Sequence, residues 1–343
     1  TGVQTCALPI FLTGIDSPLY TNWASTILSK KELEASNKLF TVLNGDDLEE
    51  SIDLFNGLTL DAIHPFTLHN LLMSLASNYE DLSFDEVLGT FFSSVSMPLY
   101  SPLYTAWESI SLSEEEKATS LALQKQKPLS TLTKTLEAYT PLLQGEIHPL
   151  SLKGLILFLT KQFGTPIEEV KEAFTSSIPM YMDSSLYAAW EALALREEER
   201  ECSNLLTTFF EKLSSNTSKE EILLRVADLL EDEVVHPVTF SSCCLTLNRV
   251  CNEDVLEELY PKLVMPLHSS LFATWASQNL SNSQQELAAQ LTGPFDTASS
   301  FDEAVSDLAS IIGMKEVHPR VLSSLYDSLS ARSEEHTSEL QSP

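Results

Sequence analysis

Glycine is scarce in this sequence, and so are the motifs that depend on it. Ten glycines among 343 residues leave little material for the loops that bind phosphates or dinucleotides, and the sequence contains no such motif. It also contains no Gly-x-Ser-x-Gly elbow, no His-Glu-x-x-His pair and no calcium-binding loop. We therefore expect no catalytic and no cofactor-binding residue, and we do not expect this chain to be an enzyme by itself.

Long apolar runs and basic residues are missing as well. The longest apolar run extends from Leu155 to Leu159, which is far too short to span a bilayer. Lysine and arginine number 20 against 49 aspartates and glutamates, for a formal net charge of −29 at pH 7. Nucleic acids and anionic membrane surfaces attract clustered cations. We therefore expect a soluble chain that neither binds nucleic acid nor inserts into a membrane.

The excess of acid leaves two interpretations open. It can form a solvated outer face that keeps the chain in solution, or it can bind a protein or peptide partner, in particular a basic one. Acidic residues exceed basic ones most strongly in residues 11–100 and 184–268. A binding patch is therefore expected in one of those two segments.

The cysteines are few and unevenly placed. Apart from Cys6, they are Cys202, Cys243, Cys244 and Cys251. This clustering does not resemble a disulfide framework and favours a reducing compartment. Together with His236 the cysteines are suitable zinc ligands, but free cysteine is also a good small buried apolar group. Cys243 and Cys244 occupy positions that are leucine or isoleucine in related segments, so we expect no metal site.

The two ends of the sequence resemble translated sequencing adapter. Residues 1–10 and 332–341 can be encoded by one DNA string read on opposite strands, and that string resembles a short-read library adapter. Extraneous segments are set aside before a fold is considered. We therefore expect residues 1–10 and 332–343 to be artefact, and the native termini and any targeting signal to be missing.

The most prominent feature that is present is a seven-residue segment that occurs four times. Its copies are Ser17-Pro-Leu-Tyr-Thr-Asn-Trp23, Ser101-Pro-Leu-Tyr-Thr-Ala-Trp107, Ser184-Ser-Leu-Tyr-Ala-Ala-Trp190 and Ser269-Ser-Leu-Phe-Ala-Thr-Trp275. The tryptophans are 84, 83 and 85 residues apart. A His-Pro pair follows each tryptophan by 41 to 46 residues, and its histidines are His64, His148, His236 and His318. Such a constant period indicates a repeat architecture.

Each period contains several helix signals and no convincing strand. Serine before the repeated Leu-Tyr is a good N-cap, and proline suits the first helical position. Further starts are predicted at Ser29, Ser83, Ser113, Thr165, Ser218, Ser281 and Ser300, a looser one at Asp46, and a cap at Asn252. After each His-Pro pair, apolar residues recur at the fourth, seventh, eighth and eleventh positions from histidine, which defines one helical stripe. We call this set the stripe.

We therefore predict an all-α fold of tandem repeats of about 84 residues, each with four or five helices, stacked into an elongated array. The repeats are predicted at residues 11–100, 101–183, 184–268 and 269–331, the last one truncated. Because this last repeat ends before a closing helix, Leu322, Leu325 and Leu329 of its stripe are expected to be partly uncovered.

The repeated tryptophans and histidines are predicted to be structural markers of the repeat. A catalytic group is needed once, whereas a packing position is needed in every copy. For the tryptophans the alternative is an aromatic ligand pocket; for the histidines, which can cap the following helix, it is a pH-responsive or metal-linked role.

The leading functional hypothesis is a non-enzymatic acidic scaffold that binds a protein or peptide. The first alternative is the repeat region of a larger protein whose enzymatic domain lies beyond the termini. The second is a ligand-binding domain with one pocket between repeats.

Overall fold

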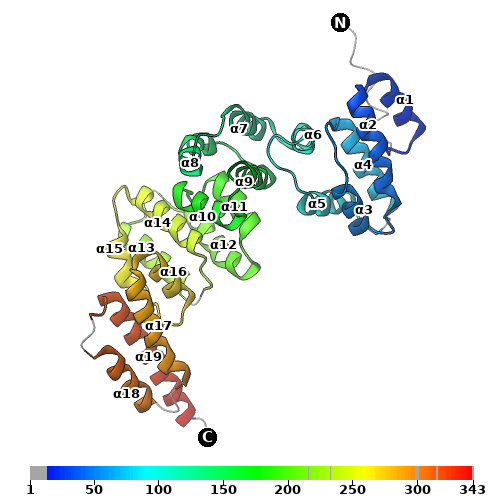
Figure 1. The fold of residues 1–343 in the computed structure, drawn as a ribbon. Coiled ribbons are helices and arrows are strands. Elements are labelled where there is room, and N and C mark those ends of the chain that lie inside the picture. Colours follow the sequence, from blue (N-terminus) through cyan, green and yellow to red (C-terminus); the bar gives the residue numbers. More distant parts are fainter. Residues whose placement is uncertain are drawn as a thin grey trace. The chain divides into compact units, whose positions relative to one another are not determined.

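The computed structural model describes residues 14–79, 81–214, 216–231, 233–297, 301–313 and 316–341. Every regular element in these ranges is a helix (Figure 1). The predicted all-α class is therefore confirmed. The adapter segment predicted at residues 1–10, with Cys6, and the start predicted at Ser300 lie outside the described residues.

The chain divides into two compact units, the first ending at Ile178 and the second beginning at Pro179. The helices of the first unit are α1 (Pro18–Ile27), α2 (Lys30–Leu39), α3 (Leu48–Asn56), α4 (Pro65–Asn78), α5 (Phe84–Ser94), α6 (Pro102–Ser111), α7 (Glu114–Lys125), α8 (Leu132–Tyr139), α9 (Pro149–Phe163) and α10 (Ile167–Ser177). Short 3-10 turns, η2 (Phe40–Asn44) and η3 (Leu142–Gln144), follow α2 and α8.

The second unit contains the remaining helices. They are α11 (Ser185–Ala194), α12 (Glu197–Glu211), α13 (Lys219–Leu230), α14 (Pro237–Cys251), α15 (Leu256–Leu259), the 3-10 turn η4 (Tyr260–Lys262), α16 (Ser270–Asn279), α17 (Asn282–Thr297), α18 (Phe301–Ile312) and α19 (Pro319–Gln341). The helix predicted to follow a cap at Asn252 is thus only one turn of α-helix followed by a 3-10 turn.

The helix starts are determined by local capping. The four serines that open the repeated segment accept the backbone N–H three residues on, each at 3.1 Å; they are Ser17, Ser101, Ser184 and Ser269. Full capping boxes are present at Ser29, Ser83 and Ser113. Each of these contacts satisfies an N–H that has no partner within its helix.

The helix starts at Asp46, Thr165 and Asn252 were predicted wrongly. Asp47, not Asp46, caps α3 by accepting the N–H of Glu50 at 2.8 Å. No side chain caps α10, because the residue before it is Pro166 and Thr165 lies outside the cap position. Asn252 ends α14 in the left-handed conformation, with φ of 55°. Asparagine tolerates that conformation better than most residues, which suits a helix end as well as a start.

The stripe of the helix after each His-Pro pair forms the centre of the packing. In α4, α9 and α14 all twelve stripe residues are buried: Leu68, Leu71, Leu72 and Leu75; Leu152, Leu155, Ile156 and Leu159; Phe240, Cys243, Cys244 and Leu247. In α19 the predicted exposure is right for Leu322, which is 44% exposed, and for Leu329, which is half-buried. It is wrong for Leu325, which is 7% exposed.

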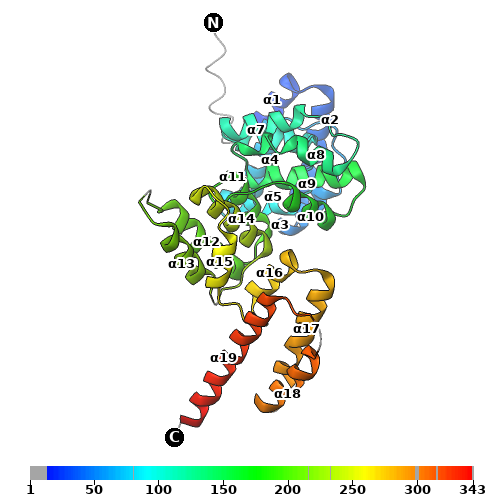
Figure 2. The same ribbon diagram turned by 90° about the vertical axis from the view of Figure 1, so that its left-hand side faces the viewer.

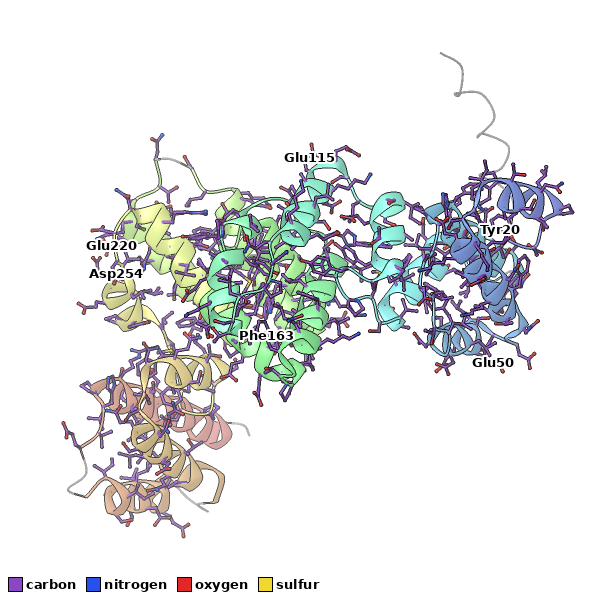
Figure 3. All side chains as sticks on the ribbon, turned by 45° about the horizontal axis from the view of Figure 1, so that its top comes forward. Tyr20, Glu50, Glu115, Phe163, Glu220 and Asp254 are labelled. Atoms are coloured by element: carbon purple, nitrogen blue, oxygen red, sulfur yellow. The ribbon has the colours of Figure 1, made fainter. Side chains whose placement is uncertain are left out.

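A buried tyrosine joins three helices in each of the first three copies. The hydroxyl of Tyr20 on α1 bonds Ser36 on α2 and Thr67 on α4, both at 2.8 Å (Figure 3 labels Tyr20). Tyr104 contacts Ser120 at 2.7 Å and Ser151 at 2.9 Å. A buried hydroxyl is costly without partners; here each has two, and burial raises the pKa of these tyrosines.

The third copy repeats this triad and the fourth replaces all of it. Tyr187 bonds Ser203 at 2.8 Å and Thr239 at 3.0 Å. At the corresponding positions of the fourth copy stand Phe272, Ala288 and Val321, all buried. Replacing every member by an apolar group leaves no buried hydroxyl unpaired, whereas replacing the tyrosine alone removes the partner of both other hydroxyls.

The turn before each repeated segment is tied to the helix of the next His-Pro pair. The donors are the backbone N–H groups of Ile15, Leu99, Met182 and Leu267. Their acceptors, at 2.8 to 2.9 Å, are Ser74 Oγ, Gly154 O, Thr246 Oγ1 and Ser328 Oγ. At Gly154 a Cβ atom would lie 2.9 Å from the carbonyl oxygen of Met97, so this close approach requires glycine.

We predict that Tyr187→Phe lowers the free energy of unfolding by about 1–3 kcal/mol, because Ser203 and Thr239 lose their partner in a dry site. Urea unfolding of the full chain measures the change. Phe272→Tyr is the matched control: it places an unpaired hydroxyl beside Ala288 and Val321 and should also destabilise. The triple variant Phe272→Tyr/Ala288→Ser/Val321→Thr should recover part of that loss. Equal stability of Tyr187→Phe and the wild type would contradict the prediction.

Candidate functional site

Each repeated tryptophan lies against the histidine of its own copy. The ring centroids of Trp23 and His64, Trp107 and His148, Trp190 and His236, and Trp275 and His318 are separated by 5.2, 5.1, 5.0 and 5.5 Å. The rings are tilted or edge-on, an arrangement that aromatic pairs favour. The structure thus joins the two sequence markers, which are more than 40 residues apart, at one place in each copy.

Each histidine also caps the helix that follows it. Its Nδ1 accepts the backbone N–H two residues on, at 3.1 Å in all four copies; the donors are Phe66, Leu150, Val238 and Arg320. A ring nitrogen that accepts a hydrogen bond carries no proton, so Nε2 holds the proton of the neutral ring. The capping role predicted for these histidines is therefore present in the geometry.

The second and third histidines are disfavoured as cations. Burial lowers the pKa of His148, an effect that Glu116 opposes. Burial likewise lowers the pKa of His236, where Glu199 opposes the effect and Arg196 adds to it. Protonation would also remove the Nδ1 acceptor that caps the helix.

Burial separates the first tryptophan from the others. Trp107, Trp190 and Trp275 are 1%, 5% and 2% exposed, whereas Trp23 is half-buried. The indole Nε1–H of Trp275 is buried and has no hydrogen-bond partner. Trp107 and Trp190 lie against His148 and His236, as described above. Trp107 also lies edge-on to Phe92, with the ring centroids 6.1 Å apart.

The clustered cysteines lie in the core of the second unit. Cys202, Cys243 and Cys244 are free and buried, and Cys251 is half-buried. Burial raises the pKa of Cys202 and of Cys244 to about 12, and it also raises that of Cys243. The expectation that Cys243 and Cys244 occupy the apolar stripe is confirmed. Within the described ranges no group of three potential metal-binding side chains comes together.

A shallow groove lies between α12 and α13, which run side by side in the second unit (Figure 2). It encloses about 530 Å³ and is lined by Asn204, Leu205, Thr208, Phe209, Lys212, Leu213, Ser214, Thr217, Glu221, Arg225 and Leu229. We call it the α12–α13 groove. The exposed surface that lines it is mostly apolar, although the lining residues include charged groups of both signs, Lys212, Glu221 and Arg225. Arg225 pairs with Asp228.

Sequence reasoning did not identify this groove. The available signal was the longer interval between Trp190 and His236, which reflects extra residues in the connector between α12 and α13. Ser214 and Thr217 of that connector line the groove. The tyrosine triads were also missed. An alignment of the four copies shows that the three positions are polar together in three copies and apolar together in the fourth.

Many of the acidic side chains lie at helix N-termini. Acidic residues stand in the first turn of α2, α3, α5, α7, α10, α12, α13 and α15. Glu50, Glu115 and Glu220 are exposed examples (Figure 3). Negative charge at this end of a helix is stabilised by the helix dipole. Part of the acidic composition therefore has a structural cause.

Comparison with protein-family models, with curated proteins and with solved structures gives no match for this chain. No described helix is both long and apolar enough to cross a membrane.

We predict that His148→Asn lowers the free energy of unfolding by about 0.5–1.5 kcal/mol, because asparagine can still cap α9 but loses the ring contact with Trp107. His148→Ala removes the cap as well and should cost about 1 kcal/mol more. Urea unfolding of the two variants distinguishes the contributions. Equal stability of the Asn and Ala variants would show that Nδ1 contributes nothing as a cap.

The lowered pKa values of His148 and His236 predict a pH dependence of stability. Below the ordinary value of 6.5 the unfolded chain binds more protons than the folded chain, so stability falls as the pH decreases through that value. The loss ends below the folded pKa. We expect His148→Asn/His236→Asn to show a smaller decrease in the urea midpoint between pH 7.5 and about 5, above most carboxylate titration. An unchanged slope would contradict this.

The cysteines are predicted to differ in reactivity. Cys202, Cys243 and Cys244 should resist alkylation in the folded chain because burial keeps them as thiols, and the thiolate is the reactive form. Half-buried Cys251 should react first. Peptide mass spectrometry after timed iodoacetamide treatment, with and without urea, gives the rate at each position. Labelling of Cys243 as fast as Cys251 without urea would be inconsistent with this core.

Proposed function

We propose that this chain is a non-enzymatic acidic scaffold of four helical repeats, at residues 11–100, 101–183, 184–268 and 269–331, that binds a protein or peptide. The observation that carries the proposal is that the recurring polar side chains form hydrogen bonds within the fold. The histidine Nδ1 atoms cap helices and the tyrosine hydroxyls bond buried serines and threonines. These groups are thereby used for packing, which is what a repeat scaffold requires of every copy.

The α12–α13 groove supports binding of a peptide. Leu205, 44% exposed, and half-buried Phe209 provide apolar contact area, and Glu221 and Arg225 at its edge can orient a backbone or a charged side chain. A surface with apolar anchors and a charged rim is typical of peptide recognition.

The exposed acids support a basic partner rather than a nucleic acid. Glu220 and Glu221 in the first turn of α13 lie beside the groove, and Asp228 adds another carboxylate to the adjoining hollow. Arg225 pairs with Asp228, and Lys262 Nζ lies 3.9 Å from a carboxylate oxygen of Glu220, so Glu221 is the groove carboxylate that is left to attract a cation. Such attraction speeds association and weakens with salt.

The proposal is tested with synthetic helical peptides of equal apolar content and net positive, zero or net negative charge. Fluorescence anisotropy should show that the positive peptide binds the full chain most tightly, with affinity falling as salt rises. Leu205→Lys should weaken binding by at least about tenfold, since it removes an anchor and adds a like charge. Leu121→Lys on α7, where leucine is 47% exposed, is the matched control and should bind as the wild type does.

Two results would overturn the proposal. Binding that does not depend on salt would refute the electrostatic part, and equal loss in Leu205→Lys and Leu121→Lys would move the site away from the groove. The stacking of all four repeats into one elongated array stays a separate prediction, which small-angle scattering of the full chain can test.

A further inference from the structure

The face of α19 that carries its stripe is uncovered at positions that are buried in the three related helices. At the fourth position from histidine, Leu322 is 44% exposed, whereas Leu68, Leu152 and Phe240 are at most 1% exposed. At the eighth position the difference is larger. Tyr326 is 71% exposed, and Leu72, Ile156 and Cys244 are 0%, 6% and 7% exposed. We call Leu322, Tyr326 and half-buried Leu329 the α19 face.

Two kinds of segment pack against the related helices. The first helix of the next copy does so at α4 and α14, through α6 and α16, and the closing segment of the same copy lies against its helix as well. Helix α5 packs against α4, and α10 packs against α9. The ring of Phe84, the first residue of α5, lies 5.8 Å from that of His69, which is next to Leu68 on α4. In the third copy Asn248 of α14 accepts the N–H of Val255 at 3.0 Å, which places the segment of α15 against that helix.

The covering segments share one apolar pattern. Each has valine, then phenylalanine or leucine four residues on, then an aliphatic residue four further on: Val87, Phe91 and Val95; Val170, Phe174 and Ile178; Val255, Leu259 and Leu263. All nine side chains are at most 3% exposed. Within α5 and α10 the first two of these residues lie four apart on one side of the helix, and with the buried residue that ends each helix they form an apolar ridge. In the third copy only Leu259 lies within α15.

We propose that the α19 face is a docking site for a helix of this class, supplied by a partner polypeptide with the same valine, phenylalanine or leucine, and aliphatic spacing. In the first two copies the helices that carry this ridge, α5 and α10, pack against the corresponding stripe helices, α4 and α9. The face consists of leucine and tyrosine side chains on a regular helix, the kind of surface on which an amphipathic helix docks through residues spaced by one turn. This site is distinct from the α12–α13 groove and does not depend on it.

The test uses a fluorescently labelled synthetic peptide with the sequence of residues 165–183, which contains the ridge of α10. It should bind the full chain saturably with one site per chain. Leu322→Lys/Tyr326→Lys should weaken binding by at least about tenfold, because it places two charges in the apolar contact. A peptide with Val170→Asp/Phe174→Asp should not bind. Both chain substitutions are at exposed positions, and circular dichroism and urea unfolding confirm that the variant is folded.

Leu121→Lys on α7 is the matched control in the chain. It changes a leucine of similar exposure, 47%, that belongs to neither proposed site, and it should bind the α10 peptide as the wild type does. The two proposals are separated because Leu322→Lys/Tyr326→Lys should leave binding of the positive peptide to the groove unchanged. Hydrogen exchange provides a second measurement: the peptide should slow exchange in residues 319–330 of the wild type.

Three outcomes would overturn the inference. The first is no binding at a peptide concentration of about 1 mM, the limit of weak specific association. The second is equal binding by Leu322→Lys/Tyr326→Lys and wild type. The third is self-association of the chain, measured by sedimentation. It would count against the inference if Leu322→Lys/Tyr326→Lys abolishes it and the α10 peptide does not compete with it. A second copy would then be the occupant, and Leu19 of α1, 54% exposed, would be the residue to examine in it.

Discussion

The helix that follows each His-Pro pair must be covered on several sides at once, and most of the other contacts follow from this. In α9, for example, Ser151 accepts the tyrosine hydroxyl, Gly154 accepts the connector N–H, and Ile156 lies on the stripe. The histidine at its start is fixed by its own cap and by the tryptophan ring. A helix this apolar cannot remain exposed to water, so each copy has to provide partners for every face.

The tyrosine triads show how a polar core changes as a unit. Three copies keep a hydroxyl with two partners, and the fourth has phenylalanine, alanine and valine at the same three places. Combinations that keep the tyrosine without its partners, or the partners without the tyrosine, leave a buried hydroxyl unpaired and lose more free energy than either end state. The physical requirement is that the three side chains match one another, and it can be met by hydrogen bonds or by apolar packing.

The acidic composition has both a local and a surface consequence. Carboxylates in the first turns stabilise the helices on which they lie, by capping and by the helix dipole. The same side chains face solvent, as Glu115 and Glu220 do, and therefore add negative charge to the surface. Under the proposed function, this surface charge would also favour basic partners.

What the sequence by itself determined is local. Serine and proline signals predicted the helix starts because a cap acts over about three residues, and the stripe predicted which faces are apolar because helical spacing is regular. The helix starts predicted at Asp46, Thr165 and Asn252 were wrong, since these residue types suit turns and helix ends as well as starts. Tertiary structure alone decided how distant residues meet. The partner of Tyr20 on α4 is 47 residues away, and the exposure of Leu322 and Tyr326 depends on which segment packs over them. Such contacts depend on the position of whole helices, which local signals do not contain.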